Sequence, residues 1–370
     1  MTSTTSASSP DASPPMGSLS IESVDDGLTY VGGPPIQLRA HLAMAGAATV
    51  DVTSVVAWSA DVPVVTVTTG VVTATAPGTA VISAELDGQV ATFDVRVAEA
   101  RVLYVTHGGT IATYPPDVDG RAQPIRKLIT THIPRAFWIE GNEIFIADDD
   151  IIYVYPATAN GEAAPTRRIF TKVSGSPFSA RAMQIVNGEL FATNVNLAVF
   201  PPTADLATEA TRHAGNTASP ATPWGTFDII GNEIVLAQAH STIDIVPITA
   251  SGPTTPTRSI RGPATGLTEL DGIYGVAASD SEIFVSLAKI GELWVYPLSG
   301  NGDIAPTRKI TNFPTGGRQI GRPWVVGKEL YVPVFDPVEE GEIWLVDRDA
   351  SGAAVPLRKT RIFFSGFIAR

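Results

Sequence analysis

One spaced pattern recurs six times in the last three-quarters of this 370-residue chain, and it constrains the fold more than any other feature. Each copy begins with an apolar residue and an alternating strand ending in Tyr, Phe or Val, usually followed by Pro, a short polar turn and usually Pro-x-Arg. The copies start at Ile111, Ile152, Leu197, Ile243, Leu293 and Ile343. An arginine follows each start after 15 residues, at Arg126, Arg167, Arg212, Arg258, Arg308 and Arg358, while the starts lie 41, 45, 46, 50 and 50 residues apart. Constant spacing inside the unit and variable spacing between units predict a repeated structural module with tolerant loops.

Two more short strands precede most copies of the pattern. The nearer strand often begins with glutamate, and its instances are Val102–Val105, Glu143–Ile146, Glu189–Ala192, Glu233–Leu236, Glu282–Val285 and Glu329–Val332. The farther strand occurs in the last five units, at Ala136–Ile139, Met183–Val186, Phe227–Ile230, Tyr274–Ala277 and Pro323–Val326. With the arginine segment as a fourth strand, each unit has the strands of one β-propeller blade.

The first unit has no farther strand of its own, and the last residues of the chain, Phe364–Arg370, resemble that missing strand. We therefore expect residues 99–370 to form a six-bladed β-propeller in which the C-terminal strand completes the first blade. Such closure hides both edges of the first sheet. The repeated I-x-V-Y, Gly and P-x-R hairpin also resembles the repeats of NHL-type six-bladed propellers.

The first quarter of the chain has a different pattern. Residues 1–16 are Ser, Thr, Ala and Pro with a single charge, a composition typical of a disordered tether. Residues 17–98 contain short alternating strands separated by Gly, Pro and Asp turn signals, at 36–42, 55–59, 64–67, 71–76, 80–86 and 91–97. Short strands at these intervals predict an all-β sandwich.

The residues of this segment also carry a family resemblance. They are Asp51-Val52-Thr53-Ser54, Ala57-Trp58-Ser59, Val64-Val65-Thr66-Val67, Gly70-Val71-Val72-Thr73-Ala74 and Ala76-Pro77-Gly78-Thr79-Ala80-Val81-Ile82. Together they resemble the bacterial Ig-like group 2 (BIG2) domain, with Val65 standing where alanine is common. The resemblance implies an Ig-like spacer or adhesive module of bacterial surface proteins or of phage tail and capsid proteins, and not an enzyme.

Composition excludes several classes of partner. The formal net charge is −12 and no basic patch with interleaved aromatics is present, so neither nucleic acid nor an anionic membrane surface is an expected partner. The chain contains no cysteine, which rules out disulfides and thiolate metal sites. No apolar run of membrane-spanning length occurs, so membrane insertion is not expected. No signal segment is visible at the N-terminus.

No catalytic motif stands out. The five histidines lack zinc-binding spacing, and neither a nucleophile elbow nor a phosphate-binding loop occurs. The six repeat arginines could form a ring of anion-binding groups. We interpret them instead as structural residues that pair across their own blades, because repeated residues belong to the repeat interface and an arginine stem covers apolar surface.

The loops between the second and third strands of each unit are expected on one face, and the long connections that enter each unit should join them there. Side chains of different units could converge on a ligand at this face. The ligand-binding candidates there are His107, Arg135, Arg181, Asn194, Asn196, Trp224, Gln238, His240 and Arg322. Trp224, in a long loop, could stack on a carbohydrate. The acidic cluster Asp148, Asp149 and Asp150 could hold Ca²⁺, or it could be solvated charge at a strand end; no other cofactor is expected.

Three functional hypotheses follow. The first is a non-enzymatic binding or adhesion protein, extracellular or at the surface of a bacterium or particle, in which the Ig-like domain is a spacer and the propeller recognises a protein or glycan. The second is a propeller hydrolase or lyase with a central metal or acid/base site. The third is a structural component of a phage or similar particle. The residues leave the identity of the ligand open.

Overall fold

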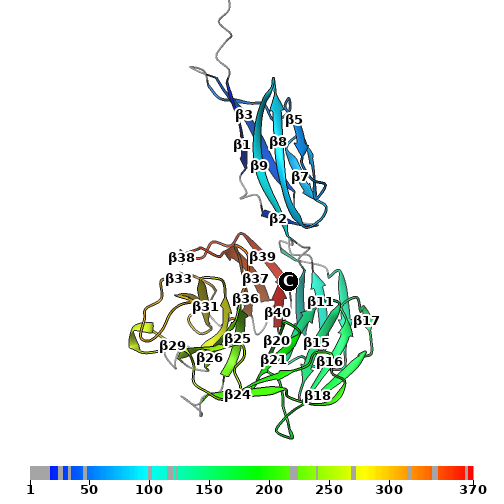
Figure 1. The fold of residues 1–370 in the computed structure, drawn as a ribbon, viewed down its shortest axis with the longest axis vertical. Helices are drawn as coiled ribbons and strands as arrows, with labels where there is room; N and C mark the ends of the chain where they lie inside the picture. The colour runs from blue at the N-terminus through cyan, green and yellow to red at the C-terminus, as the bar shows by residue number, and fades with distance from the viewer. Residues whose placement is uncertain are drawn as a thin grey trace, which may run out of the picture. The chain divides into compact units, whose positions relative to one another are not determined.

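The protein has an all-β fold that divides into two compact units, Met1–Arg101 and Val102–Arg370 (Figure 1). The computed structural model describes residues 17–23, 28–31, 35–44, 48–98, 102–114, 120–121, 124–216, 224–238, 241–267, 272–314, 319–335, 341–362 and 366–369. Within these ranges the one helix is the 3-10 turn η1 (Pro263–Thr265). No helix in the described part of the chain has the length and hydropathy needed to cross a membrane.

The first unit consists of two mainly antiparallel sheets, and its described buried residues form two core clusters. One sheet contains, in order, β1 (Ser18–Ser23), β3 (Ile36–Ala43), β7 (Val71–Ala74) and β6 (Val65–Thr68), and β4 (Val50–Asp51) also pairs with β3. The other contains β2 (Leu28–Tyr30), β9 (Gln89–Ala98), β8 (Gly78–Leu86) and β5 (Ala57–Ala60). Alternate residues of β3 are buried, and Leu38 from the first sheet belongs to the same core as Ile82 and Val95 from the second. One face of each sheet is thus buried and the other is solvated.

The residues that resemble the BIG2 signature hold one corner of this unit together. The Thr53 Oγ1 accepts a hydrogen bond of 2.9 Å from the Ala40 backbone N–H, and the Asp51 Oδ1 accepts one of 2.9 Å from the Thr53 N–H. The Trp58 Nε1 donates to the Thr53 carbonyl at 2.9 Å, and the Trp58 ring packs against both core clusters. Asp51 and Thr53 therefore fix the turn that positions Trp58.

The second unit contains six separate antiparallel sheets within its described residues, which gives it β-propeller character. From the inner to the outer strand, the first three are β40 (Gly366–Ala369), β10 (Leu103–His107), β11 (Thr110–Tyr114), β13 (Arg126–Ile129); β14 (Ala136–Glu140), β15 (Glu143–Asp148), β16 (Ile151–Pro156), β18 (Arg167–Val173), β19 (Ser176–Pro177); and β20 (Ala182–Val186), β21 (Glu189–Thr193), β22 (Leu197–Phe200), β24 (Arg212–Asn216). The last three are β25 (Trp224–Ile230), β26 (Glu233–Gln238), β27 (Thr242–Pro247), β29 (Arg258–Ile260); β30 (Ile273–Ala278), β31 (Glu282–Leu287), β32 (Glu292–Pro297), β33 (Arg308–Thr311); and β34 (Gln319–Ile320) with β35 (Trp324–Val326), β36 (Glu329–Phe335), β37 (Gly341–Asp347), β39 (Arg358–Ile362).

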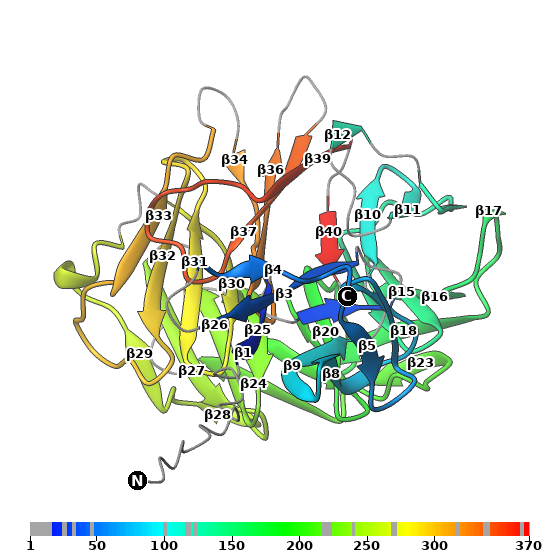
Figure 2. The same ribbon diagram turned by 90° about the horizontal axis from the view of Figure 1, so that it is seen from above.

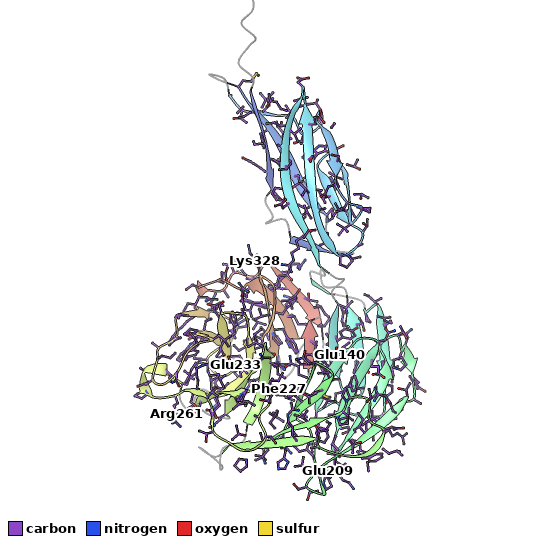
Figure 3. The ribbon with its side chains drawn as sticks, in the orientation of Figure 1. Glu140, Glu209, Phe227, Glu233, Arg261 and Lys328 are labelled. Atoms are coloured by element: carbon purple, nitrogen blue, oxygen red, sulfur yellow. The ribbon has the colours of Figure 1, made fainter. Side chains whose placement is uncertain are left out.

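The core of this unit lies between neighbouring sheets. Central strands such as β15 and β26 are buried along almost their whole length, because a sheet on each side covers both of their faces. One apolar cluster, for example, joins Phe191 of the third sheet to Phe227 and Leu236 of the fourth. Phe227, labelled in Figure 3, is fully buried. This arrangement explains why the central strands have nearly continuous runs of apolar residues in the sequence.

Short parallel pairings link the outer strand of each sheet to a turn of another. The linking strands are β17 (Gly161–Glu162) on β13, β23 (Leu206–Glu209) on β18, β28 (Gly252–Thr254) on β24, β38 (Gly352–Ala353) on β33 and β12 (Gly120–Arg121) on β39. A single bridge between Ile260 and Gly302 links the fourth and fifth sheets. Every sheet is thereby joined to the next along the chain, and β12 joins the sixth to the first. On the inner side β40 pairs with β10, which lies beside it in Figure 2.

Polar side chains in the same turns reinforce these links. The Asn160 Oδ1 accepts a hydrogen bond from the Lys127 N–H at 3.0 Å, and the Asp205 Oδ1 accepts one from the Arg168 N–H at 3.2 Å. The Asn301 Oδ1 does the same for the Ser259 N–H at 3.1 Å. Asn and Asp at these turn positions thus accept hydrogen bonds from backbone N–H groups of the preceding sheet.

Replacing Asn301 with alanine is expected to lower the free energy of unfolding of the second unit by about 0.5–1.5 kcal/mol, because one hydrogen bond between two sheets is lost. Urea unfolding followed by tryptophan fluorescence measures the change. Asn301→Asp is the matched control, since Asp205 makes the equivalent bond in another repeat. Equal stability of the alanine variant and the wild type would contradict the role assigned to this side chain.

The strands expected from the sequence are confirmed as strands, with shifted ends. In the first unit, β1, β2 and β4 were not expected, and the strand predicted at 55–59 is β5 at Ala57–Ala60. In the second unit, the strand predicted at Pro323–Val326 begins one residue later, as β35. The tether predicted at residues 1–16 lies outside the described residues.

Candidate functional site

The inner strands of all six sheets of the second unit converge on one cavity of about 140 Å³. Each sheet contributes at least one residue near the start of its inner strand or the loop beside it. The lining residues are Arg135, Ala136, Phe137, Arg181, Ala182, Met183, Thr226, Tyr274, Arg322, Trp324, Pro333, Phe335, Gly366 and Ile368. The set combines three guanidinium groups with four aromatic rings, and it contains no carboxylate among the described residues.

Two of the lining residues lie in irregularities of their strands. The register between β25 and β26 shifts between Trp224 and Phe227, a segment that contains Thr226. The register between β30 and β31 shifts between Ile273 and Gly275, which leaves Tyr274 unpaired with β31. A bulge of this kind turns a side chain away from the direction that strict alternation would give it. Tyr274 is accordingly 43% exposed, although its strand neighbours at 275–277 are buried.

Arg322 is the most constrained cation of the cavity. Its Nη2 lies 3.4 Å from the Oδ1 of Asp228, and the side chains of Arg322 and Asp228 are 16% and 15% exposed. Its Nε donates to the Val276 carbonyl at 3.1 Å, and its guanidinium lies 4.5 Å from the centroid of the Trp324 ring. Residues of three different sheets therefore hold one guanidinium in place.

Gly275 makes this position of Arg322 possible. A Cβ atom added at Gly275 would lie 2.5 Å from the Arg322 Cβ and 2.6 Å from its Cα. No side chain can occupy that space without moving the backbone of the arginine. Glycine at position 275 thus permits the close approach of the fifth and sixth sheets beside the cavity.

Asp228 is a largely buried carboxylate on which burial and the neighbouring groups have opposite effects. Burial raises the pKa of Asp228, and the Arg322 guanidinium, two backbone N–H groups and the Gln184 side chain act against that rise. The donors are Ile229 N–H, at 3.0 Å from Oδ1, and Ala278 N–H, at 2.8 Å from Oδ2. Burial likewise lowers the pKa of Arg322. The ion pair thus lies largely buried, where its charges are compensated by each other and by hydrogen bonds to neighbouring groups.

The other two arginines are at the open side of the cavity. Arg135 is 51% exposed and pairs with the Asp149 Oδ1 at 2.6 Å. Arg181 is exposed, and its guanidinium makes no ion pair or hydrogen bond within the described structure. The Thr226 Oγ1 is buried and has no hydrogen-bond partner in the described structure, whereas the buried Arg322 Nη2 has only its ion pair with Asp228. A buried hydroxyl without a partner costs free energy, so the Thr226 Oγ1 is suited to a polar ligand or water.

The structure brings three of the predicted ligand-binding residues together at this cavity: Arg135, Arg181 and Arg322. The others lie elsewhere. His107 is exposed at the end of β10, and Asn194 and Asn196 belong to the turn between β21 and β22. The buried Gln238 donates from Nε2 to the Asp244 Oδ2, within the fourth sheet. The backbone of Trp224 pairs with Gln238, while the Trp224 side chain and all of His240 lie outside the described residues.

Two carboxylates of the predicted Ca²⁺ cluster contact basic side chains. Asp148 Oδ2 lies 3.4 Å from the His132 Nδ1, and Asp149 pairs with Arg135. Asp150 uses its backbone carbonyl to accept hydrogen bonds from Thr171. The described part of the chain contains no group of three or more His, Cys, Asp or Glu placed to hold a metal ion. The Ca²⁺ site therefore stays a prediction from the sequence.

The repeat arginines lie on the outer strands, away from the cavity. Five of them pair with the glutamate that begins the second strand of the same sheet: Arg167–Glu143 at 2.6 Å, Arg212–Glu189, Arg258–Glu233 at 2.7 Å, Arg308–Glu282 and Arg358–Glu329 at 3.7 Å. Glu233 is labelled in Figure 3. The hydrogen bond from Arg258 holds the pKa of Glu233 below its usual value. In the first repeat Val102 stands at the glutamate position, opposite Arg126.

Four of these arginines also bind the next sheet along the chain. Arg167 donates to the carbonyls of Pro202 and Ala204, and Arg212 donates to that of Ile248. Arg258 donates to the Leu298 carbonyl, and Arg308 to those of Ala350 and Arg348. Each guanidinium therefore ties its own sheet to its neighbour. These four arginines therefore make structural hydrogen bonds between neighbouring sheets.

Four residues at or beside the cavity were not among the predicted site residues: Thr226, Asp228, Tyr274 and Phe335. One signal was available for Asp228, which stands in the apolar strand Phe227–Ile230. A carboxylate inside such a strand needs a partner, because burial of an unpaired charge is costly. Thr226 and Tyr274 face the cavity through strand irregularities, which the strand periodicity does not reveal.

Comparisons with known proteins give no family. No protein-family model matches the chain, and no curated protein matches it. Similar solved structures include the computationally designed Ika8 protein, at 14% identity and a TM-score of 0.40, covering 82% of this chain and 85% of that chain. They also include the WD40 β-propeller domain of Doa1 (8%, TM-score 0.42, 78% and 78%) and Hsv2 of Kluyvelomyces marxianus (12%, TM-score 0.41, 80% and 93%). Likeness at these scores assigns neither a function nor a site.

Proposed function

We propose that this chain is a non-enzymatic binding protein in which an Ig-like domain of the BIG2 type precedes a six-bladed β-propeller. The signature residues Asp51, Thr53 and Trp58, with their mutual hydrogen bonds, support the first assignment. Six linked sheets and the pairing of β40 with β10 support the second, with the C-terminal strand as the closing strand of the ring. Closure leaves no free inner edge on the first sheet.

The observation that carries the binding function is the cavity where all six sheets converge. Aromatic rings and guanidinium groups of different repeats meet there, and the buried Thr226 Oγ1 has no hydrogen-bond partner among the described residues. Ligand sites in proteins are concave and mostly apolar, with a few polar groups that fix orientation. The propeller is therefore the recognition platform, for a glycan or a protein, and the Ig-like domain is its spacer.

The BIG2 resemblance favours an extracellular or cell-surface location on a bacterium, or attachment to a phage or similar particle. The proposal assigns this chain to recognition at such a surface. It includes no nucleic-acid partner and no membrane insertion, as the composition suggests.

A binding screen with two cavity variants tests the proposal. Wild-type protein, Tyr274→Ala and Arg181→Gln are applied to arrays of acidic and neutral glycans and of surface proteins. We expect retention of the wild type on at least one ligand and at least tenfold weaker retention of both variants, because both side chains line the cavity.

Two results count against the proposal. Equal retention of the wild type and both variants would place binding outside the cavity. Conversion of a retained glycan to shorter or unsaturated products, detected by chromatography, would favour a propeller hydrolase or lyase. Arg261→Gln, a substitution of an exposed arginine outside the cavity, is the control.

A further inference from the structure

We propose that the central cavity recognises a sugar acid at the end of a glycan, with Arg181 as the residue that binds its carboxylate. This inference rests on the proposed binding function and specifies the chemistry of its ligand. Three independent observations on the cavity support it: its charge, its aromatic rings and its size.

The charge of the cavity favours an anion. Its lining holds three guanidinium groups and no carboxylate among the described residues. Arg322 is neutralised by Asp228 and Arg135 by Asp149, whereas Arg181 has no counter-ion in the described structure. An arginine fork matches the two oxygens of a carboxylate and binds them with two parallel hydrogen bonds. Arg181 is therefore the guanidinium available for a ligand carboxylate.

The aromatic rings favour a sugar over a flexible acidic side chain. Tyr274 is 43% exposed and its ring centroid lies 5.9 Å from that of Phe335, at an interplanar angle of 46°. Trp324 also lines the cavity, and the guanidinium of Arg322 lies over its ring. The negative face of an aromatic ring attracts the polarised C–H groups on one face of a sugar ring. The Thr226 Oγ1, which has no hydrogen-bond partner in the described structure, complements a sugar hydroxyl.

The size of the cavity favours a single terminal residue. Its volume of about 140 Å³ is well below the roughly 300–1,000 Å³ of sites that enclose a drug-sized ligand. A chain end fits such a site, whereas a longer segment needs an extended groove. The ligand is thus the terminal uronic acid of a glycan and not the interior of a polysaccharide.

Isothermal titration with matched sugars tests this inference on the full chain. The probes are methyl β-D-glucuronide and methyl β-D-glucoside, which differ only at C6, where the acid has a carboxylate and the neutral sugar a hydroxymethyl group. The corresponding galacturonide and galactoside form a second pair. We expect at least tenfold tighter binding of one acid than of its neutral partner at low salt, and weakening of the acid complex as salt is raised.

Substitution of Arg181 gives the second measurement. Arg181→Gln should lower the affinity for the acid at least tenfold and leave that for the neutral sugar unchanged, whereas Arg181→Lys should retain part of the affinity. Arg181 is exposed, so neither substitution should change thermal unfolding. Arg261→Gln should bind as the wild type does.

Each other outcome overturns the inference in a distinguishable way. Equal affinity for acid and neutral sugars, with loss in Tyr274→Ala, would refute the sugar-acid assignment and leave the glycan platform standing. Binding of a short acidic peptide with no binding of any sugar would refute it in favour of a protein ligand. No binding of any of these probes would refute it as well. Cleavage of a probe would refute both the inference and the proposed binding function.

Discussion

Replacing Arg322 with leucine is expected to lower the free energy of unfolding of the second unit by roughly 3–5 kcal/mol at neutral pH. The substitution leaves the Asp228 carboxylate buried without its guanidinium, and it also removes the hydrogen bond to the Val276 carbonyl. Breaking a buried ion pair from one side costs more than the pair contributes, because an uncompensated charge remains. Urea unfolding followed by tryptophan fluorescence measures the change.

The cost of this substitution should depend on pH with a definite sign. Burial already raises the pKa of Asp228 above 3.8, and loss of the arginine raises it further. Between 3.8 and the folded-state pKa, the folded protein keeps the proton that the unfolded chain releases, so stability falls as the pH rises. The deficit of Arg322→Leu relative to the wild type should therefore be smaller at pH 4.5 than at pH 7.

A matched surface pair provides the control. Arg135 and Asp149 also form an ion pair beside the cavity, but their side chains are 51% and 71% exposed. Arg135→Leu should cost less than about 1 kcal/mol, with little pH dependence. Adding Asp228→Asn to Arg322→Leu should recover part of the lost stability. If Arg322→Leu costs no more than Arg135→Leu, or if the double variant is less stable than the single one, the buried charge does not have the role assigned to it.

The strands and the role of the repeat arginines were open to prediction because they are periodic. An apolar strand with glutamate at its start, and an arginine at a fixed distance after the start of the next strand, place the two charges opposite each other in every repeat that has the glutamate. The structure has this pairing in five repeats, including Arg212 with Glu189. The carbonyls that Arg212 and its equivalents bind in the next sheet could not be predicted, because they depend on the distance between sheets.

The candidate site was only partly predictable. Arg135, Arg181 and Arg322 stand in equivalent connections just before the inner strands, so their convergence follows from the repeat. Asp228 and Tyr274 differ from one repeat to the next. The exposure of Tyr274 results from a register shift that no alternation of apolar and polar residues reveals. Residues whose environment differs from one repeat to the next, such as Asp228 and Tyr274, could therefore not be predicted from the repeat pattern.

Replacing Arg308 with alanine is the second substitution for which we expect a large effect, a loss of roughly 2–4 kcal/mol in the free energy of unfolding. The guanidinium pairs with Glu282 in its own sheet, where the two side chains are 16% and 20% exposed. It also donates to the Ala350 carbonyl at 3.1 Å and the Arg348 carbonyl at 2.7 Å in the next sheet. One substitution therefore removes bonds within a sheet and between two sheets.

The geometry of the guanidinium, and not its charge alone, should decide the size of this loss. The fork of Arg308 reaches the carboxylate and the two carbonyls together, and it lies 5.6 Å from the centroid of the Phe284 ring. Lysine keeps the charge but has no planar fork, so Arg308→Lys should recover less than half of the loss. Arg261→Ala is the control, because Arg261 is exposed, and it should change stability by less than about 0.5 kcal/mol. Urea unfolding of all three variants compares them directly. If Arg308→Ala is as stable as Arg261→Ala, the Arg308 side chain does not contribute to stability. Apolar packing and backbone pairing would then hold the sheets together.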